Sequence, residues 1–366
     1  MKEMQNHSRL FIPGPTEVRQ EILQAQAKPI IGHRSEACAE LIARIQPRLR
    51  KLFATENRVF INVSSGTGLQ EAAIRNCSNE KVLNCVNGAF SDRWRKVSEA
   101  NGKRNQVLDF PWGQPVAPER VVEALEQDEF DALTIVHNET STGVTSPIKE
   151  IAEAVRSLPQ GDRILILVDS VSGVGGIRID VDDWDLDVVL TSSQKALALP
   201  PGLAICSVSD RALEKAKTVK NRGYYFDFLI LDKYIEKNQT PYTPAISLLF
   251  ALDEQLDHIL AEGLDNRFER HLAMRDRTLE WSRRYGLSQF AARGYESPTV
   301  SCINALPSFS ASEMVKFAKS RGMIISDGYG PLKGKSFRIA HMGDTMMEDL
   351  EELLIVLDEF MGNLRS

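Results

Sequence analysis

The chain has 366 residues, of which 43% are hydrophobic and 26% are charged, and its net charge is −6 at pH 7. That length suits two domains or one large one, and the negative charge argues against a nucleic-acid partner, which requires a basic surface. No apolar run is long enough to cross a membrane, and the five cysteines form no CxxC pair. We therefore expect a cytoplasmic protein with reduced thiols and no metal site.

Residues 58–209 alternate between short apolar runs and helical patterns. Six runs are continuous and rich in Val, Ile and Leu, which is typical of strands covered on both faces; they span 58–63, 81–86, 132–138, 164–170, 188–193 and 202–209. Between the runs, Ser91 and Asp210 could cap helices, and Pro118 and Pro147 fall at first-turn positions. This alternation predicts an α/β domain with a mostly parallel sheet and helices on both faces.

The pattern changes after Pro244. Apolar residues recur at helical spacing over 246–262, and a second helical pattern covers 267–286. The segments "TVSCINAL", "GMIISDG" and "SFRIAHMG" read as strands, and a helix closes the chain. We therefore expect a smaller C-terminal α+β domain. The proposed division is an N-terminal segment over the active site (1–20), a large domain (21–250) and a small domain (251–366).

Charged residues follow two of the predicted core strands. One strand ends on Asp169, and Lys195 follows the next; in open α/β sheets, ligands bind beyond the carboxyl ends of the strands. Gly66, Thr67 and Gly68 lie between another strand and a helix, where backbone amides, a hydroxyl and the helix N-terminus form a cradle for phosphate. Each feature also has a simpler interpretation: a solvent-facing lysine, an aspartate that caps a turn, and a tight turn.

Taken together, the three features match the needs of one cofactor, pyridoxal 5'-phosphate. A primary amine forms an imine with its aldehyde, a carboxylate holds its ring nitrogen protonated, and helix-end amides bind its phosphate. Asp169 would raise the pKa of the ring nitrogen by favouring the charged form. Lys195, once displaced by the substrate amine, would move the Cα proton.

A series of motifs supports this interpretation. In chain order they are "FIPGPTEV", "SSGTGLQEAAI", "NGAF", "HNETSTGV", "LVDSVSGVGG", "SSQKALALPPG" and "TPAISL". Together they resemble the class V, fold-type-I pyridoxal-phosphate aminotransferases, most of all the alanine/serine–glyoxylate (or pyruvate) group. The resemblance implies that Lys195 is the Schiff-base lysine and Asp169 the partner of the pyridine nitrogen. It also implies that Gln194 binds the phosphate together with Thr67 and Gly68.

The resemblance assigns further residues. Phe90 falls where the family stacks an aromatic ring on the cofactor, although a core phenylalanine is the rival interpretation. Thr140 matches a hydroxyl near the cofactor's phenolic oxygen, unless it only forms a turn. Arg338 corresponds to the arginine that grips the substrate α-carboxylate, for which a guanidinium fork is suited; the alternative is a strand-edge surface arginine. "PGPT" matches the segment whose backbone lies over the substrate.

Two segments are implied to act across a homodimer with active sites at the subunit interface. "TPAISL" resembles the segment that reaches the neighbouring subunit's phosphate, which makes Thr243 the candidate, with Thr240 as a second possibility. His33 and Arg34 resemble residues that bind a second anionic group in phosphoserine aminotransferases. The simpler alternative is that Arg34 caps or salt-bridges the following helix.

The expected reaction is a ping-pong transamination between a small amino acid, alanine or serine, and a 2-oxo acid, glyoxylate or pyruvate. The second candidate is an aminotransferase for a substrate with another anionic group, such as phosphoserine, aspartate or 2-aminoethylphosphonate. A desulfurase or related lyase requires a nucleophilic cysteine in the C-terminal domain, and Cys302 lies inside an apolar strand. A non-catalytic scaffold is disfavoured by the intact set of Lys195, Asp169 and Arg338.

Overall fold

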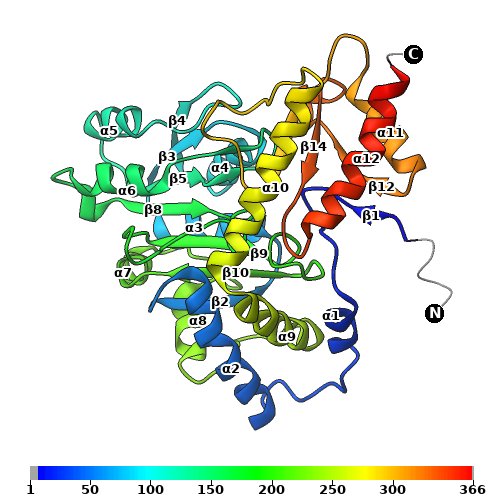
Figure 1. The fold of residues 1–366 in the computed structure, drawn as a ribbon. Coiled ribbons are helices and arrows are strands. Elements are labelled where there is room, and N and C mark those ends of the chain that lie inside the picture. The colour runs from blue at the N-terminus through cyan, green and yellow to red at the C-terminus, as the bar shows by residue number, and fades with distance from the viewer. Residues whose placement is uncertain (1–6, 365–366) are drawn as a thin grey trace.

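The computed structural model describes residues 7–364, and the expected N-terminal segment therefore includes six residues, 1–6, that lie outside the described part. A seven-stranded sheet forms the centre of the molecule (Figure 1), in the order β2-β10-β9-β8-β5-β3-β4. Its strands are β2 (Arg58–Val63), β3 (Lys81–Val86), β4 (Arg104–Asp109), β5 (Ala132–Val136), β8 (Leu165–Asp169), β9 (Val188–Ser192) and β10 (Leu203–Val208). Only β10 runs antiparallel to its neighbours. The mostly parallel sheet is confirmed, and six strands point their carboxyl ends to one edge.

The sequence located six of these seven strands and missed β4. The six are buried along nearly their whole length, which produces the continuous apolar runs. In contrast, β4 forms one margin of the sheet, and its residues alternate between exposed and half-buried. An edge strand of this kind carries polar residues such as Asn105 and Gln106, and so it lacks the apolar run that marked the others.

Helices cover both faces of the sheet, as expected. On one face α3 (Gly66–Cys77), α4 (Ala89–Ala100), α7 (Asp210–Thr218) and α8 (Phe228–Ile235) pack against strand residues such as Leu165 and Leu167. On the other face α2 (Glu36–Phe53), α5 (Pro118–Glu126), α6 (Ile148–Arg156) and α9 (Ile246–Glu262) pack against Ile166 and Val168 of the same strand. The period-two alternation along β8 thus divides the core into two layers.

The helix starts differ in detail from the expectations. Pro118 is the first residue of α5, as expected. Pro147 immediately precedes α6 and does not lie in its first turn. The predicted caps Ser91 and Asp210 are both wrong: α4 begins at Ala89, so Ser91 is its third residue, and the side chain that caps α7 belongs to Ser209. The Ser91 hydroxyl reaches back instead and accepts from the N–H groups of the two residues before the helix, at 3.0 Å each.

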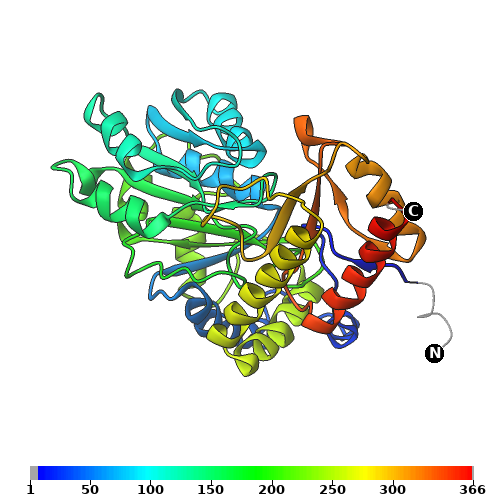
Figure 2. The ribbon, with the colours of Figure 1, turned by 45° about the horizontal axis from the view of Figure 1, so that its top comes forward.

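The C-terminal part is an α+β unit beside the sheet (Figure 2). Its three-stranded antiparallel sheet has the order β11-β14-β13, and the unit comprises α10 (Leu264–Arg284), β11 (Val300–Asn304), α11 (Ala311–Ser320), β12 (Met323–Ile324), β13 (Ser326–Asp327), β14 (Ser336–Ala340) and α12 (Met347–Asn363). The predicted strand "GMIISDG" is divided between β12 and β13. Near the N-terminus, β1 (Arg9–Leu10) pairs with β12, so this strand packs onto the C-terminal unit.

A buried arginine joins the C-terminal unit to the central domain. Arg267, on α10, is 1% exposed. Its Nε donates to the carbonyl of Gly175 at 2.9 Å, and its Nη2 donates to the carbonyl of Ala196 at 2.9 Å and to Asp344 at 3.0 Å. The first two carbonyls belong to the large domain and the third acceptor to the C-terminal unit. This guanidinium therefore fixes the loop after Lys195 relative to α10.

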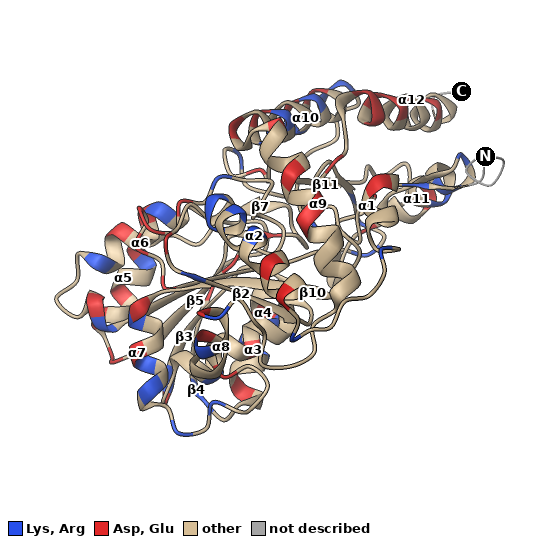
Figure 3. Ribbon diagram, turned by 90° about the horizontal axis from the view of Figure 1, so that it is seen from below, with Lys and Arg blue, Asp and Glu red and all other residues tan. Residues whose placement is uncertain are grey.

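The outer helices carry charges of both signs side by side, as Figure 3 shows along α5, α6 and α7. Many of these side chains pair with each other; on α4, for example, Arg95 contacts both Asp92 and Glu99. Neighbouring carboxylates therefore neutralise part of the positive charge on the outer helices. Among residues 7–364, no helix combines the length and apolar character that a membrane span requires.

Candidate active site

The loop after β2 forms the start of α3 and has the geometry of an anion cradle. Gly66, Thr67 and Gly68 are the first three residues of the helix, where backbone N–H groups lack the usual partner one turn earlier in the helix. The N–H of Gly68 donates to the carbonyl of Ser65 at 3.0 Å. A Cβ atom at Gly66 would lie 2.5 Å from a methyl group of Val171, and one at Gly68 would overlap the Ser64 hydroxyl. A larger residue at either position would therefore displace the side chain of Val171 or Ser64.

Asp169 ends β8 and is 5% exposed. One carboxylate oxygen accepts from Gln70 Nε2 at 2.6 Å, and the other accepts from the N–H of Val171 at 2.9 Å. Burial raises the pKa of Asp169 to about 6, although these two hydrogen bonds act in the opposite direction. The carboxylate is thus fixed in orientation but poorly solvated, so a cationic partner would stabilise its charged form.

Lys195 lies three residues beyond the end of β9 and is half-buried in the wall of a cavity, not free on the surface. Its ammonium donates to the carbonyl of Pro13, in the "PGPT" segment. Burial is the main cause that lowers the pKa of Lys195 to about 8; the nearby positive charge of Arg338 contributes to the shift, and Asp169 opposes it. A lysine with this environment is a better nucleophile and base near neutral pH than an exposed one.

These elements meet in one cavity of about 240 Å³. Most of the predicted site residues line it: Gly66, Thr67, Phe90, Thr140, Asp169, Gln194 and Lys195. Gly68 lies directly after Thr67 in the same helical turn. The amine of Lys195, the carboxylate of Asp169 and the glycine turn are far apart in the sequence. They nevertheless meet as walls of one cavity at the carboxyl edge of the sheet.

The buried carboxylate of Glu139 links the segments that carry Phe90 and Thr140. Glu139 is fully buried and accepts from the N–H groups of Phe90 and Ser91, at 3.1 and 3.0 Å, and from the Ser141 hydroxyl at 2.6 Å. The start of α4 is thereby tied to the turn that carries Thr140, whose hydroxyl lies 2.6 Å from that of Ser172. Phe90 faces the cavity and is not a simple core residue.

Arg338 lies on β14 and is 8% exposed, so it is not a surface arginine. Nε and Nη2 donate to the carbonyl of Asp327 at 3.2 and 3.1 Å, and Nη1 donates to the carbonyl of Thr140 at 3.3 Å. A guanidinium has five N–H donors, so each Nη atom retains one N–H without a partner among the described residues. Two remaining N–H donors of a guanidinium suit a carboxylate. Burial lowers the pKa of Arg338 because its charge is incompletely solvated.

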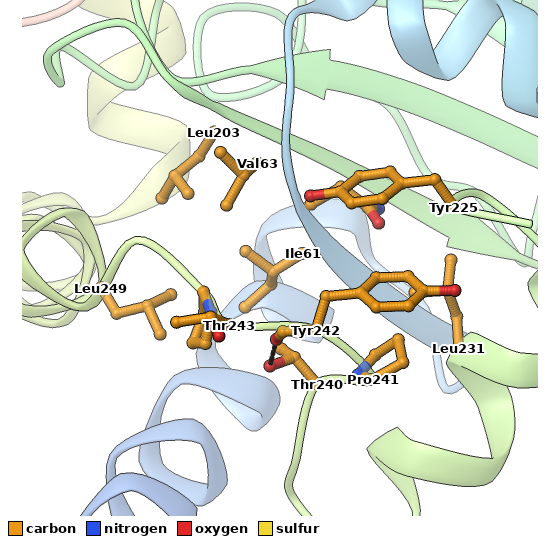
Figure 4. Close-up of a pocket in the computed structure, with 12 residues that line it drawn as sticks. Ile61, Val63, Leu203, Tyr225, Leu231, Thr240, Pro241, Tyr242, Thr243 and Leu249 are labelled. Carbon is orange, nitrogen blue, oxygen red and sulfur yellow. Dashed lines mark hydrogen bonds between the residues drawn. The ribbon is translucent and has the colours of Figure 1, made fainter. Parts of the chain in front are cut away.

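Arg34 and Thr243 lie together but outside this cavity. The guanidinium of Arg34 donates to the carbonyls of Thr240 and Pro241 at 2.5 and 2.9 Å, so the alternative that Arg34 caps or salt-bridges the following helix is wrong. Thr243 is exposed and lines a small neighbouring pocket (Figure 4), where the rings of Tyr225 and Tyr242 stack at 4.8 Å. Within one chain, neither residue contributes to the Lys195 cavity.

The cavity also contains residues that the sequence analysis missed. Arg93 lines it one helical turn after Phe90, and Gln70 lines it one turn after Gly66. Tyr329, from the loop before β14, contacts Phe90 with ring centroids 5.5 Å apart and lies 5.6 Å from the Arg338 guanidinium. Helical spacing from two residues already selected would have identified Arg93 and Gln70. Tyr329 carried no such signal, because the C-terminal fold alone brings it to the site.

The donor set fits pyridoxal 5'-phosphate. Two buried polar atoms at the cavity, Ser192 Oγ and Gln70 Oε1, have no hydrogen-bond partner within residues 7–364, and such atoms require a partner from a ligand or water. The carboxylate of Asp169 suits a protonated ring nitrogen, the amine of Lys195 suits an aldehyde, and the turn at Thr67 suits a phosphate.

Comparison with known proteins defines the class. The sequence model described as "Aminotransferase class-V" matches residues 16–332, and the chain belongs to this family. Curated relatives include an L-aspartate–glyoxylate aminotransferase of Paracoccus denitrificans and a serine–glyoxylate aminotransferase of Methylorubrum extorquens. Each is 34% identical, over 93% of this chain and 87% of the relative. An alanine–glyoxylate aminotransferase from Nostoc sp. has a similar structure, with a TM-score of 0.91 and 30% identity over 98% of this chain and 97% of its own.

Proposed function

We propose that this aminotransferase exchanges an amino group between alanine or serine and glyoxylate or pyruvate, in two half-reactions on pyridoxal 5'-phosphate. The observation that carries the proposal is that Lys195, Asp169 and the N-terminus of α3 line one cavity. The relatives named serine–glyoxylate and alanine–glyoxylate aminotransferase support the same choice.

Each site residue has a defined role in this proposal. When bound, the cofactor supplies an electron-withdrawing ring that stabilises negative charge at the substrate Cα. Asp169 holds the proton on the ring nitrogen, because a buried carboxylate favours a cation beside it. Lys195, with its pKa lowered to about 8 by burial, removes and returns the proton at Cα. Arg338 binds the substrate α-carboxylate through its two remaining Nη–H donors.

The other predicted residues would hold the cofactor in place. Gly66, Thr67, Gly68 and Gln194 surround the phosphate end, Phe90 stacks on the ring, and Thr140 lies near the phenolic oxygen. The "PGPT" segment would cover the amine of Lys195, since the Pro13 carbonyl accepts a hydrogen bond from this amine. The water-accessible part of the site is thereby reduced, which strengthens its electrostatic interactions.

We further propose that the enzyme is a homodimer in which Thr243 binds the partner's phosphate. Support comes from the aromatic surface beside Thr243: Tyr224 is 74% exposed and Tyr225 is 41% exposed, and both rings contact Tyr242. Large exposed apolar side chains near one another favour an interface. The proposed division at residue 250 falls just inside α9. The cytoplasm is the proposed compartment because all five cysteines are free thiols in the structure.

A second candidate function is transamination of a substrate with a second anionic group. The relative named L-aspartate–glyoxylate aminotransferase favours it, and so does the exposed guanidinium of Arg34 beside Thr243, on the surface proposed to face a partner. A desulfurase is disfavoured because burial raises the pKa of the Cys302 thiol to about 11, which leaves little thiolate at neutral pH.

The proposal is tested by the absorbance of protein reconstituted with pyridoxal 5'-phosphate. A band at the edge of the visible range is expected from the wild-type protein, and addition of L-alanine or L-serine should shift it. Absence of the band would refute catalysis by this cofactor. A shift with phosphoserine or aspartate, and none with alanine or serine, would favour the second candidate over the first.

A further inference from the structure

Arg93 is a cation in the cavity wall that has no anionic partner. Its Nη1 lies 3.4 Å from the Thr67 hydroxyl, and its Nη2 donates to the Tyr329 hydroxyl at 3.2 Å. The guanidinium carbon lies 4.7 Å from the centre of the Phe90 ring. Within residues 7–364, Arg93 forms no ion pair, whereas Arg95, two residues further along α4, is bound to two carboxylates.

The charge of Arg93 acts on both catalytic groups. Burial is the main cause of the pKa shifts of Lys195 and Asp169, and the positive charge of Arg93 lowers both pKa values. Arg93 and Lys195 are the two cationic residues among those that line the cavity in the described part of the chain. Because the amine of Lys195 is required for the aldehyde, Arg93 is the cation that remains for another anionic group.

The contact with Thr67 identifies the anion. A phosphate monoester carries close to two negative charges at neutral pH, whereas a helix N-terminus offers only about half of a positive charge. A group bound by the Thr67 hydroxyl and the first amides of α3 would lie next to Nη1 of Arg93. The buried Ser192 hydroxyl, unpartnered in residues 7–364, lines the same space and adds a further donor.

We propose that Arg93 is the cationic partner of the phosphate group of the cofactor. The inference rests on the proposed function, which supplies the phosphate. Its chemical basis is the fork of N–H donors on a guanidinium, which matches phosphate oxygens and carries the compensating charge. Phe90 supports the opposite side of the same guanidinium, so one aromatic ring would orient both the cofactor ring and the arginine that binds its phosphate.

The test compares the affinity of the apoprotein for pyridoxal 5'-phosphate with its affinity for pyridoxal, which lacks the phosphate. Arg93→Gln should weaken binding of the phosphorylated ligand roughly 10- to 100-fold. Binding of pyridoxal should fall much less, because pyridoxal has no phosphate and loses only the effect of the Arg93 charge on the pKa of Lys195. Arg93→Lys retains the charge but lacks the fork of N–H donors, so its affinity for pyridoxal 5'-phosphate should lie between those of wild type and Arg93→Gln. Arg95→Gln, on the same helix but outside the cavity, serves as the matched control and should alter neither affinity.

Three results would overturn this assignment. Equal affinities of wild type and Arg93→Gln for pyridoxal 5'-phosphate would remove the phosphate role. An equal loss for both ligands would assign Arg93 to the packing of Phe90. The ratio of the affinities for pyridoxal 5'-phosphate and pyridoxal could also stay unchanged while the Michaelis constant rises for aspartate but not for alanine. That result would assign the charge of Arg93 to the side-chain carboxylate of an acidic substrate. If the wild-type apoprotein bound neither ligand, the proposed function itself would fail first.

Discussion

Gly14 lies directly against the side chain of Lys195. A Cβ atom at position 14 would be 2.7 Å from both Cδ and Nζ of the lysine, and Gly14 has a φ of +122°. We expect Gly14→Ala to displace the amine and slow the appearance of the cofactor band several-fold. Gly102→Ala is the matched control, because Gly102 also has a positive φ, +70°, but nothing lies within 4 Å of an added Cβ. Equal rates in the two variants would contradict the close contact.

The pH dependence of cofactor capture follows from the burial of Lys195. Burial disfavours the charged ammonium and lowers its pKa from 10.5 to about 8, so the reactive neutral amine appears as the pH rises through that value. The rate of band formation should increase with pH, with a midpoint near 8. In Arg338→Gln the midpoint should move upward, since the arginine charge contributes to the shift. A midpoint above 10 in wild type would contradict the buried environment.

Asp169 should destabilise the apoprotein. Burial raises its pKa from 3.8 to about 6. The buried carboxyl therefore contributes its full share to the free energy of unfolding below pH 3.8, where it is protonated. That share is lost as the pH rises through 6 and the carboxyl ionises. Asp169→Asn avoids this cost. At pH 7.5 the variant apoprotein should gain on the order of 3 kcal/mol at most in free energy of unfolding, measured in urea, while transaminase activity falls. At pH 4 the gain should disappear; a gain that persists there would have another cause.

Removal of the Arg338 guanidinium should chiefly weaken substrate binding. Arg338→Ala is expected to cost about 2–5 kcal/mol, because a desolvated charge pair loses one partner. The measurement is the alanine concentration that half-saturates the spectral shift. Arg321→Ala, an exposed arginine paired with Glu359 in the same C-terminal unit, is the matched control and should behave as wild type. Unchanged affinity in Arg338→Ala would refute the carboxylate assignment.

Mixed dimers test whether Thr243 acts across the interface. A Lys195→Ala subunit and a Thr243→Ala subunit each carry one defect, and their hybrid contains one intact site only if Thr243 serves the partner's cofactor. Activity of the co-purified hybrid should therefore exceed that of either homodimer. The same experiment with Thr240→Ala decides between the two threonines. No gain with either variant would remove the in-trans role.

The sequence predicted those parts of the site that local order determines. Strand ends locate Asp169 and Lys195, because parallel strands deliver their carboxyl ends to one edge, and the glycine turn is visible from its residues alone. It failed where distant segments meet. Tyr329 reaches Phe90 only through the C-terminal fold, and the sequence analysis did not select Glu139, whose carboxylate accepts from the N–H groups at the start of α4. The missed strand β4 had the composition of an exposed edge.

The arginine on α10 has a consequence for substrate choice. Arg267 is buried and donates to the carbonyls of Gly175 and Ala196 near Lys195, so separating the two units would break two desolvated charge-assisted hydrogen bonds. These hydrogen bonds resist relative movement of the two units, and they favour a fixed distance between the amine of Lys195 and the guanidinium of Arg338. Discrimination among amino donors would then depend on the side chains that line the space between Lys195 and Arg338, and relative movement of the two units would contribute little.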